Sequence, residues 1–446
     1  MTARETFPPS PSSVSRCRPD ISTRTRRAVF FPRLLDRLIR CGTLTFIDPQ
    51  GHSRIFAGPS IDGIAPVTIR LRDVSLDWHL ALRPAMAVGE AYMDGDLTVE
   101  QGSLYDFLGM AAYNLCRPHC PPGQRLASRA ATLLRRLYQW NPVTRATQNA
   151  RHHYDLAVDF YDLFLDADRQ YSCAYYAHSG MTLEEAQEAK KRHIAAKLLL
   201  APGQRVLDIG CGWGGLALAL AAAAGVEVLG ITLSREQLDE ARRRAALNGL
   251  ADRVRFELCD YRNVKGVFDR IVSVGMFEHV GIGHYREFFA ALREHLADGG
   301  VALLHSIGSG DGPGATNPWI RKYIFPGGHM PALSEVLPAV EHSGLQVTDI
   351  EILREHYADT LREWRHRFQV NRDEVARLYD ERFCRMWEFY LAGSEAAFRH
   401  QGLMVFQMQM AKGNAGIPAT RDYMTASSAK DTRCDRPPDE SADRSG

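Results

Sequence analysis

The sequence predicts an α/β protein whose main domain is a Rossmann-like, doubly wound and mostly parallel sheet, preceded by a smaller α+β domain. From about residue 150 onward, short β-branched apolar runs alternate with longer helix-forming runs, as in parallel strands joined by helices. The first of these strands leads directly into a glycine-rich loop, GCGWGG at Gly210–Gly215. Because ligands of such folds bind beyond the carboxyl ends of the strands, functional residues are expected there.

The elements of the main domain can be assigned in order along the chain. Ser234 is a typical N-cap for the second helix, and Gly225 and Gly249 are typical helix ends. The predicted strands are RVLDIG, VEVLGIT, VRFELCD, FDRIVSVG and VALLHSIG. The predicted helices are LALALAAAAG, SREQLDEARRRAALNG and HYREFFAALREHLADGG.

The smaller domain begins with FFPRLLDRLIRCG, in which Leu34, Leu35, Leu38 and Ile39 form one helical face. We interpret this run as the first helix of a small domain and not as a membrane-surface helix. The strand-like runs TLTFIDPQG and VTIRLRD follow it. The two terminal segments have little apolar surface to bury and are predicted to be disordered. The predicted segments are therefore 1–30 (disordered), 31–140 (small domain), 150–412 (main domain) and 413–446 (disordered).

Composition and cysteine usage exclude several classes of protein. A net charge of +1, with 45% hydrophobic and 24% charged residues, is ordinary for a globular protein and argues against nucleic acid as a partner. The nine cysteines are scattered singly, which is typical of a reducing compartment. Cys116 and Cys120, in CRPHCPP, lack the second pair that a zinc site needs, so no metal is predicted. Without an evident transmembrane segment or export signal, the protein is expected in the cytoplasm.

Three features favour S-adenosylmethionine over NAD as the ligand of the glycine loop. The loop is compact and contains Trp213, unlike the G-x-G-x-x-G form of dinucleotide sites. The second strand ends in Thr232, with no acidic residue there for a ribose diol. The third strand ends in CDYR, where Asp260 to Arg262 are placed to frame an adenine.

Several motifs, taken in order, make the chain resemble a known family. They are HYDLAVDFYDLFLDADRQYSCAYY, MTLEEAQEAK, VLDIGCGWGG, GITLSREQ, DRIVSVGMFEHVG, LLHSIG and YIFPGGHMP. Together they resemble the cyclopropane-fatty-acyl-phospholipid synthases and the related mycolic acid cyclopropane synthases. The stretch GEAYMDGDL at Gly89–Leu97 resembles the N-terminal domain of the phospholipid-type enzymes. The resemblance implies a class I methyltransferase fold, in agreement with the strand and helix pattern.

The resemblance also implies which residues hold S-adenosylmethionine. Gln237 would take the recognition role that an acidic residue has in many other methyltransferases. The implied cofactor residues are Tyr171, Ser172, Val206, Leu207, Asp208, Ile209, Gly210, Cys211, Gly212, Trp213, Gly214, Thr232, Leu233, Ser234, Arg235, Glu236, Gln237, Tyr261 and Arg262.

The implied reaction transfers a methylene group from S-adenosylmethionine to the cis double bond of unsaturated phospholipid acyl chains, giving a cyclopropane ring. An alkene is a weak nucleophile, so its attack needs tight positioning in a water-free pocket. A base must then remove a proton from the added methyl group of the resulting carbocation, whose charge the aromatic faces of Tyr171, Tyr175 and Phe277 could stabilise. Family members are understood to bind a hydrogencarbonate ion as this base. Its implied ligands are Cys173, Glu278, His305, the backbone of Ile307, and Tyr357.

Each of these ligands also has an ordinary structural interpretation. Glu278 could cap the following helix, and His305 could be a satisfied core histidine. Cys173 could be a small buried hydrophobe, and Tyr357 could simply pack at a helix start. The joint occurrence of all the ligands at family positions favours the functional interpretation. His279, the neighbour of Glu278, is given no catalytic part.

Two departures from the family pattern bear on function. Ser394, in YLAGSEAAF, stands where a cysteine is common, which rules out a thiolate nucleophile at this position. Ala157 and Val158 replace the small polar residues usual in the HYD motif, which bears on cofactor contacts. The stretch NPWIRKYIFPGGHMP has two interpretations. Its residues could line an acyl tunnel and contact lipid head groups, or they could be ordinary core residues followed by a solvated basic pair. The residues concerned are Trp319, Ile320, Ile324 and Phe325 for the tunnel, and Arg321 and Lys322 for the phosphate head groups.

Other functions remain open at this point. The same carbocation could lose a different proton or be reduced, giving methylene- or methyl-branched chains. A methyltransferase acting on small amines and a non-catalytic lipid-binding scaffold are further alternatives. For the preferred function, the partners are unsaturated phospholipids at the membrane surface, with the protein peripheral on the inner face. A homodimer formed through the N-terminal module is compatible with the resemblance.

Overall fold

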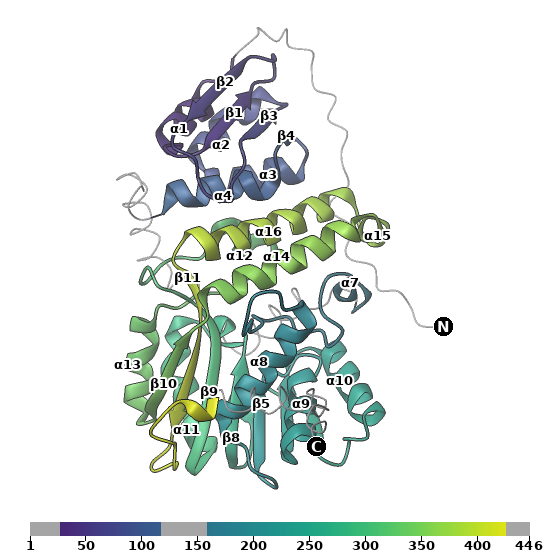
Figure 1. The fold of residues 1–446 in the computed structure, drawn as a ribbon, viewed down its shortest axis with the longest axis vertical. Coiled ribbons are helices and arrows are strands. Elements are labelled where there is room, and N and C mark those ends of the chain that lie inside the picture. The colour runs from purple at the N-terminus through teal and green to yellow at the C-terminus, as the bar shows by residue number, and fades with distance from the viewer. Residues whose placement is uncertain (1–26, 117–157, 425–446) are drawn as a thin grey trace, which may run out of the picture.

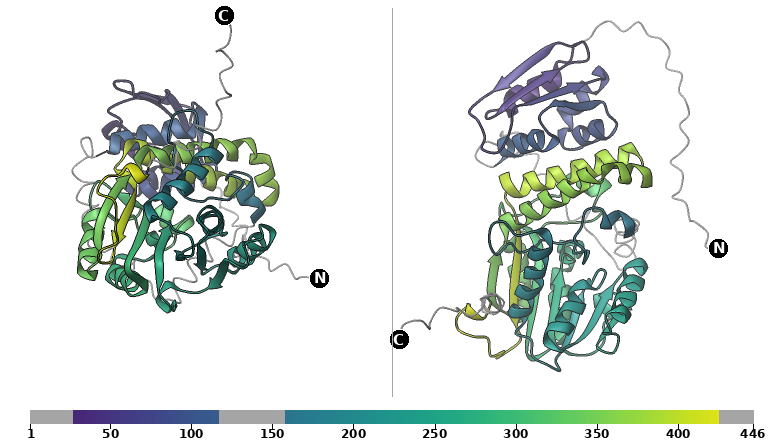
Figure 2. Two further views of the ribbon diagram at one scale, coloured as in Figure 1. Left: turned by 60° about the horizontal axis from the view of Figure 1, so that its bottom comes forward. Right: turned by 45° about the vertical axis from the view of Figure 1, so that its right-hand side comes forward.

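The computed structural model describes residues 27–116 and 158–424. Figure 1 shows a small N-terminal sheet at the top, the long helices α14 (Arg354–Val370) and α16 (Glu381–His400) in the middle, and a larger sheet below. The right-hand view of Figure 2 keeps this order, so the two helices separate the two sheets.

The larger sheet has seven strands in the order β10-β11-β9-β8-β5-β6-β7. β11 is antiparallel to both of its neighbours, whereas the remaining neighbouring strands are parallel. The strands are β5 (Arg205–Ile209), β6 (Glu227–Thr232), β7 (Val254–Leu258), β8 (Phe268–Val274), β9 (Leu296–Ser309), β10 (Gln346–Ile352) and β11 (Leu403–Ala411). The predicted doubly wound, mostly parallel sheet is therefore confirmed.

The structure corrects the sequence prediction at one edge of this sheet. β10 and β11 were not predicted, and in β11 the buried glutamines Gln407 and Gln409 interrupt the apolar run. The helix predicted over HYREFFAALREHLADGG ends at His295, because Leu296 already pairs with Phe268 at the start of β9. The last part of that predicted helix is therefore strand.

Helices cover both faces of the larger sheet. Side chains of α8 (Leu183–Leu198), α9 (Gly215–Ala224) and α10 (Arg235–Leu247) form one core cluster with the strands. Side chains of α11 (Tyr285–His295) and α13 (Leu333–Ser343) form another. Consecutive strand residues alternate between the clusters, since Val206 belongs to the first and Leu207 to the second.

The N-terminal part has the predicted α+β character. Its four strands lie in the order β2-β1-β3-β4, with β1 parallel to β3. Leu35 and Ile39 of the first helical run are buried in the core of this part, which supports the small-domain interpretation over a membrane-surface helix. The elements are α1 (Phe30–Leu38), β1 (Thr43–Ile47), β2 (Ser53–Ala57), β3 (Val67–Leu71), α2 (Asp77–Leu82), α3 (Pro84–Met93), β4 (Leu97–Gln101) and α4 (Leu104–Leu115).

The N-terminal part rests on the long helices of the main domain. The Tyr92 hydroxyl donates to Glu388 of α16 at 2.9 Å. α12 (Pro318–Tyr323) also lies against α3, where a Cβ at Gly89 would come within 2.5 Å of Trp319 Nε1. Gly89 is therefore required for this close approach. In the described ranges, no helix combines the length and apolar character needed to cross a membrane.

Parts of the two segments predicted to be disordered have definite structure. The backbone N–H groups of Val29 and Phe30 donate to Asp77 Oδ2 at 2.7 and 2.8 Å, which fixes the start of α1. At the other end, Arg421 donates to Asp349 of β10 at 2.5 Å. Residues 27–30 and 413–424 therefore extend the folded parts, while the remainder of both predicted segments lies outside the described residues.

Candidate active site

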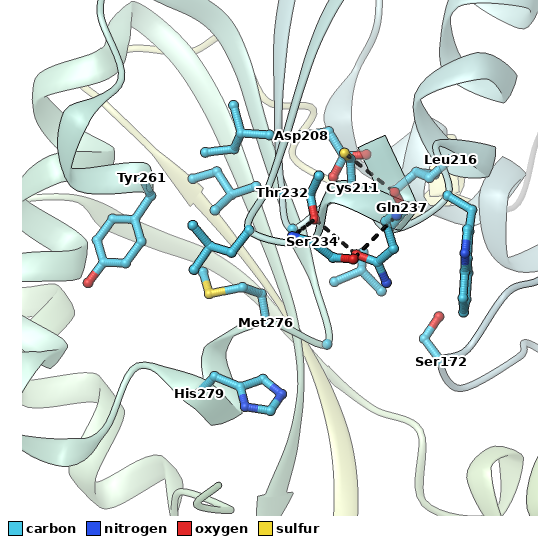
Figure 3. A pocket seen from close by; sticks show the side chains of 18 of the residues that line it. Ser172, Asp208, Cys211, Leu216, Thr232, Ser234, Gln237, Tyr261, Met276 and His279 are labelled. Carbon is cyan, nitrogen blue, oxygen red and sulfur yellow. Dashed lines mark hydrogen bonds between the residues drawn. The ribbon is translucent and has the colours of Figure 1, made fainter. Parts of the chain in front are cut away.

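A pocket lies where the carboxyl ends of β5, β6 and β8 meet the glycine loop (Figure 3). It holds about 1260 Å³ of empty space, counting its open mouth, which is room for a nucleoside-sized ligand. The predicted cofactor residues that line it are Tyr171, Ser172, Asp208, Ile209, Gly210, Cys211, Gly212, Trp213, Thr232, Leu233, Ser234, Gln237, Tyr261 and Arg262. Residues far apart in the chain are thus brought to one cavity.

Other predicted cofactor residues do not line this pocket. Val206 and Leu207 are buried in β5, where they pack into the two core clusters. Gly214 is the N-cap of α9, and a Cβ there would meet Phe256 at 2.6 Å, so it packs helix against sheet. Arg235 and Glu236 are exposed in the first turn of α10. Their places follow from the strand and helix periods, which direct these side chains away from the cavity.

The glycine loop makes a tight turn against the loop after β8. Gly210 has φ +84°, and the N–H groups of Gly210 and Cys211 both donate to Ile231 O, at 2.9 and 3.0 Å. A Cβ at Gly210 would lie 2.8 Å from the Met276 Cβ. Glycine is therefore needed here both for the backbone angle and for the close approach of Met276.

The sequence has no acidic residue at the end of β6. Gln237, in the first turn of α10, lies beside that strand end instead. Thr232 Oγ1 donates to Gln237 Oε1 at 2.9 Å, so the amide NH₂ of Gln237 is the group left to face a ligand. Ser234 caps α10 by accepting from the Gln237 N–H at 3.3 Å. The carboxamide is thus held in place by the end of the strand and by the cap.

Tyr261 and Ser172 mark opposite sides of the pocket in Figure 3. On the Tyr261 side, the Asp260 carboxylate accepts from Arg262 Nε and Nη2, both at 2.8 Å. The Arg262 guanidinium lies 5.3 Å from the centre of the Tyr261 ring. This pairing orders the CDYR stretch that the sequence assigned to an adenine.

Sequence reasoning missed the loop after β8 as a wall of the pocket. Met276 and His279 both line it, and Figure 3 shows the His279 ring beside Met276. Burial lowers the pKa of His279 to about 4, so its ring is neutral at neutral pH. The sequence feature that could have identified these residues is their position, because they directly follow a parallel strand at its carboxyl end.

Glu278 lies between this pocket and strand β9. Its Oε1 accepts from the Ile307 N–H at 2.6 Å, whereas its Oε2 is buried without a hydrogen-bond partner. Burial raises the Glu278 pKa to about 7. The helix-cap interpretation fails, because α11 begins at Tyr285 and its N-cap, His284, makes no side-chain cap bond. Ile307 contributes its N–H to Glu278 here, so its predicted contact with the base is indirect in this arrangement.

His305 lies two residues before Ile307 on β9, and side chains two apart in a strand share a face. The Gln407 carboxamide nitrogen lies 3.1 Å from His305 Nδ1. With Gln407 as donor, Nδ1 accepts and Nε2 carries the proton of the ring. Burial lowers the pKa of His305 to about 3, so the ring is a neutral donor through Nε2.

Cys173 and Tyr357 belong to the same apolar cluster, and Ile307 packs against it. Cys173 is buried, and burial raises the pKa of its thiol, so it is no thiolate nucleophile. The next residue, Ala174, donates its N–H to Thr360 Oγ1 at 3.1 Å, which joins this segment to the helix that carries Tyr357. Cys173, Glu278, His305, Ile307 and Tyr357 do not line the pocket of the glycine loop, and their role as ligands of a base stays a prediction.

The aromatic residues predicted to stabilise a cation lie in different parts of the structure. Tyr171 is partly buried and packs against the cluster of Cys173 and Tyr357, with its hydroxyl 3.0 Å from that of Tyr390. Tyr175 is instead stacked between two histidine rings, with centroid distances of 4.3 and 5.0 Å. Phe277 packs in the other core cluster, among the aromatic residues of α11. The three rings therefore do not form one cluster, and their role in stabilising a cation stays a prediction.

The predicted lipid segment packs against the same apolar cluster. Trp319 and Ile324 are buried within it, and Ile320 and Phe325 lie against it. Lys322 Nζ is bonded to Glu90 of α3 at 2.6 Å, so this cation is engaged by the N-terminal part. Of the two sequence departures, Ser394 lies on α16 and Val158 begins α7 (Val158–Asp162). Ala157 and Cys120 lie outside the described residues.

Known proteins are similar to this chain in sequence, and solved structures are similar to part of it in fold. Residues 142–408 match the family described as mycolic acid cyclopropane synthetase. The chain is 38% identical over 359 residues to the cyclopropane-fatty-acyl-phospholipid synthase of Escherichia coli strain K12, covering 80% of this chain and 91% of the relative. It is 37% identical over 397 residues to the tuberculostearic acid methyltransferase of Mycobacterium tuberculosis, covering 84% and 89%. A mycolic acid cyclopropane synthase solved with SAH and CTAB has a TM-score of 0.57 at 34% identity, covering 61% of this chain and 99% of that one.

Proposed function

The chain belongs to the mycolic acid cyclopropane synthetase family, and from this premise we propose that it transfers a methylene group from S-adenosylmethionine to the cis double bond of unsaturated phospholipid acyl chains. The observation that carries the proposal is the position of Glu278. Its neighbour His279 lines the cofactor pocket, and its carboxylate binds Ile307, which packs against the apolar cluster. The ionisable side chain of Glu278 thus lies between the cofactor pocket and the apolar cluster, whose side chains suit a hydrocarbon chain.

In the proposed reaction, the alkene carbon bonds to the sulfonium methyl carbon as the methyl–sulfur bond breaks. This leaves S-adenosylhomocysteine and a carbocation on the acyl chain. Loss of a proton from the added methyl group then closes the ring. The apolar cluster around Cys173 and Tyr357 excludes water that would otherwise trap the cation.

The proposed base is a hydrogencarbonate ion, which when bound would accept the proton of the added methyl group. Cys173, Glu278, His305 and Tyr357 would hold it, with Ile307 acting through Glu278. A protonated Glu278 Oε2 and the His305 Nε2–H are donors suited to an anion. A carboxylate in direct contact with the carbocation could be trapped as an ester, which favours a held anion over Glu278 itself as the base.

The substrate places the protein at a membrane surface. Unsaturated phospholipids lie in membranes, so we expect the protein to act peripherally on the inner face, with Arg321 near phosphate head groups. A homodimer formed through the N-terminal part stays a prediction.

The test is incubation of the purified protein with S-adenosylmethionine and vesicles of a monounsaturated phospholipid. Mass spectrometry and proton NMR of the released fatty acids read the product. A gain of one CH₂, with upfield cyclopropane protons and no olefin signal, is the expected result. Unchanged lipid, despite cofactor binding measured by calorimetry, would overturn the proposal and direct the search to other acceptors such as small amines.

A second candidate product is a methylene- or methyl-branched acyl chain. It is favoured by the similarity to the tuberculostearic acid methyltransferase, which extends over both parts of the chain. The same measurement separates the two functions. A reduced methyl branch adds two hydrogens more than a cyclopropane, and a methylene branch keeps olefin protons.

A further inference from the structure

Lys190 is a buried charge that the proposed reaction does not use. Its side chain on α8 is 0% exposed, and its ammonium donates to Gln170 Oε1 at 2.6 Å and to Ser172 Oγ at 2.8 Å. Both partners are neutral. A buried ammonium costs several kcal/mol when no anion compensates it, so this position calls for a nearby negative charge.

The carboxylates near Lys190 are bonded elsewhere. Asp166 accepts the main-chain N–H groups of Gln170 and Asp168, at 2.9 and 3.1 Å. Asp168 pairs with Lys191 at 2.8 Å and also with Arg244. The Lys190 ammonium donates to Gln170 and Ser172 instead of to either carboxylate. Both carboxylates still stabilise the ammonium electrostatically, and an anion bound in the pocket would add to that stabilisation.

Ser172 connects Lys190 to the cofactor pocket. It lines the pocket on the side opposite Tyr261, as Figure 3 shows. An ammonium can only donate, so Ser172 Oγ accepts from Lys190 and its own O–H must point to another acceptor. The wall of the pocket therefore presents a hydroxyl donor with a positive charge directly behind it.

The arginines that line the pocket are already paired with carboxylates. Arg169 donates to Asp162 and Glu240, at 2.5 and 2.6 Å. Arg262 is bonded to Asp260. Lys190 differs because its hydrogen-bond partners are neutral and the carboxylates of Asp166 and Asp168 act on its charge only at longer range, so no carboxylate neutralises it directly.

An acceptor of the opposite character lies in the same pocket. Asp208, at the end of β5, is buried and lines the cavity, and its Oδ2 has no hydrogen-bond partner. The amino-acid end of S-adenosylmethionine carries an ammonium and a carboxylate. A carboxylate acceptor and a charge-backed hydroxyl donor are the pair of groups that such a zwitterion requires.

We propose that Lys190 is a positioning residue for the carboxylate of S-adenosylmethionine, acting through the Ser172 hydroxyl. Lys190 does not line the pocket, so it touches Ser172 and not the ligand. The segment itself has separate support, because Gln187 donates to the carbonyls of Gln170 and Ser172 at 3.2 and 3.0 Å. Removing the charge therefore need not collapse the loop. The inference rests on S-adenosylmethionine as the methyl donor, and not on the identity of the lipid.

The test is calorimetric binding of matched ligands to wild type and to Lys190→Met. S-adenosylhomocysteine carries the carboxylate, 5′-methylthioadenosine lacks the amino-acid end, and decarboxylated S-adenosylmethionine lacks only the carboxylate. Loss of a charge-assisted contact should lower the affinity for S-adenosylhomocysteine by about tenfold or more, since such hydrogen bonds are about twice as strong as neutral ones. The affinities for 5′-methylthioadenosine and for the decarboxylated ligand should stay within about twofold of wild type.

If Lys190 had only a structural role, Lys190→Met would lower the affinities for all three ligands together, and this result would overturn the proposal. An unchanged affinity for S-adenosylhomocysteine would also overturn it. Ser172→Ala provides a second variant should Lys190→Met fail to fold. It should show the same selective loss, and equal losses for all ligands would again contradict the proposal. These measurements need no lipid. A wild-type protein that binds S-adenosylhomocysteine but modifies no lipid would refute the proposed function and leave this inference standing.

Discussion

The carboxylate of Glu278 is bonded to the backbone N–H of Ile307 at 2.6 Å, which ties the loop after β8 to strand β9. The other carboxylate oxygen is buried without a hydrogen-bond partner. One oxygen therefore holds the group in place, and the second remains for a ligand. Because burial raises the pKa to about 7, this second oxygen can carry a proton near neutral pH and donate it to an anion.

Glu278→Gln should leave the fold and cofactor binding intact while reducing kcat by about a hundredfold or more. The amide oxygen can still accept from the Ile307 N–H, but the ionisable group is lost. Turnover on phospholipid vesicles and calorimetric binding of S-adenosylhomocysteine measure the two effects. Glu287→Gln, at an exposed position on α11, is the control and should keep normal turnover. Near-normal kcat in Glu278→Gln would remove the anion-holding role.

The raised Glu278 pKa also predicts how stability depends on pH. The folded state prefers the protonated acid, so the stability contribution is fully present below the ordinary pKa of 4.5 and is lost as pH rises through about 7. Relative to Glu278→Gln, the wild type should lose up to about 3 kcal/mol between about pH 5 and pH 8. Thermal unfolding of both proteins across this range measures the difference. A difference that does not change with pH would show that Glu278 has an ordinary pKa.

Gln407→Leu should reduce kcat by about tenfold or more with little effect on S-adenosylhomocysteine binding. Gln407 donates to His305 Nδ1 and so keeps the ring proton on Nε2. Leucine cannot donate, so the two tautomers of His305 would mix. Nitrogen NMR of labelled histidine detects the change directly. If His305 kept the Nε2–H tautomer in the variant, a group other than Gln407 would control the tautomer.

Gly210→Ala should abolish most cofactor binding. The added Cβ would lie 2.8 Å from the Met276 Cβ, and the backbone has φ +84°, so the loop must shift. Gly249→Ala is the matched control, since φ is +65° there and no heavy atom lies within 4 Å. The control should lose only about 1–2 kcal/mol of stability from backbone strain, with normal S-adenosylhomocysteine affinity. Equal affinities in the two variants would show that the contact with Met276 is unimportant.

The local pattern of the sequence was enough to predict the central strands and the glycine loop. β-branched runs, the Ser234 cap and the glycine helix ends are local signals, and they describe local backbone preferences. Such signals are carried by neighbouring residues, so they can be read without knowing what packs against them. Glu278, His305 and Tyr357 were assigned as a set by the resemblance of the motifs to a known family, and not by local pattern.

Tertiary structure alone decided the features that depend on long-range pairing and burial. β11 is recognised by its antiparallel pairing between β9 and β10, although buried glutamines interrupt its apolar run. Lys190 lies in the charged run LEEAQEAKKRH, which on its own suggests a solvent-exposed helix face, yet the fold buries it behind Ser172. The bond from Glu278 to Ile307 likewise joins two strand ends that are distant in sequence. Desolvation and hydrogen bonding of this kind depend on the whole packed assembly of strands and helices, and no single segment encodes them.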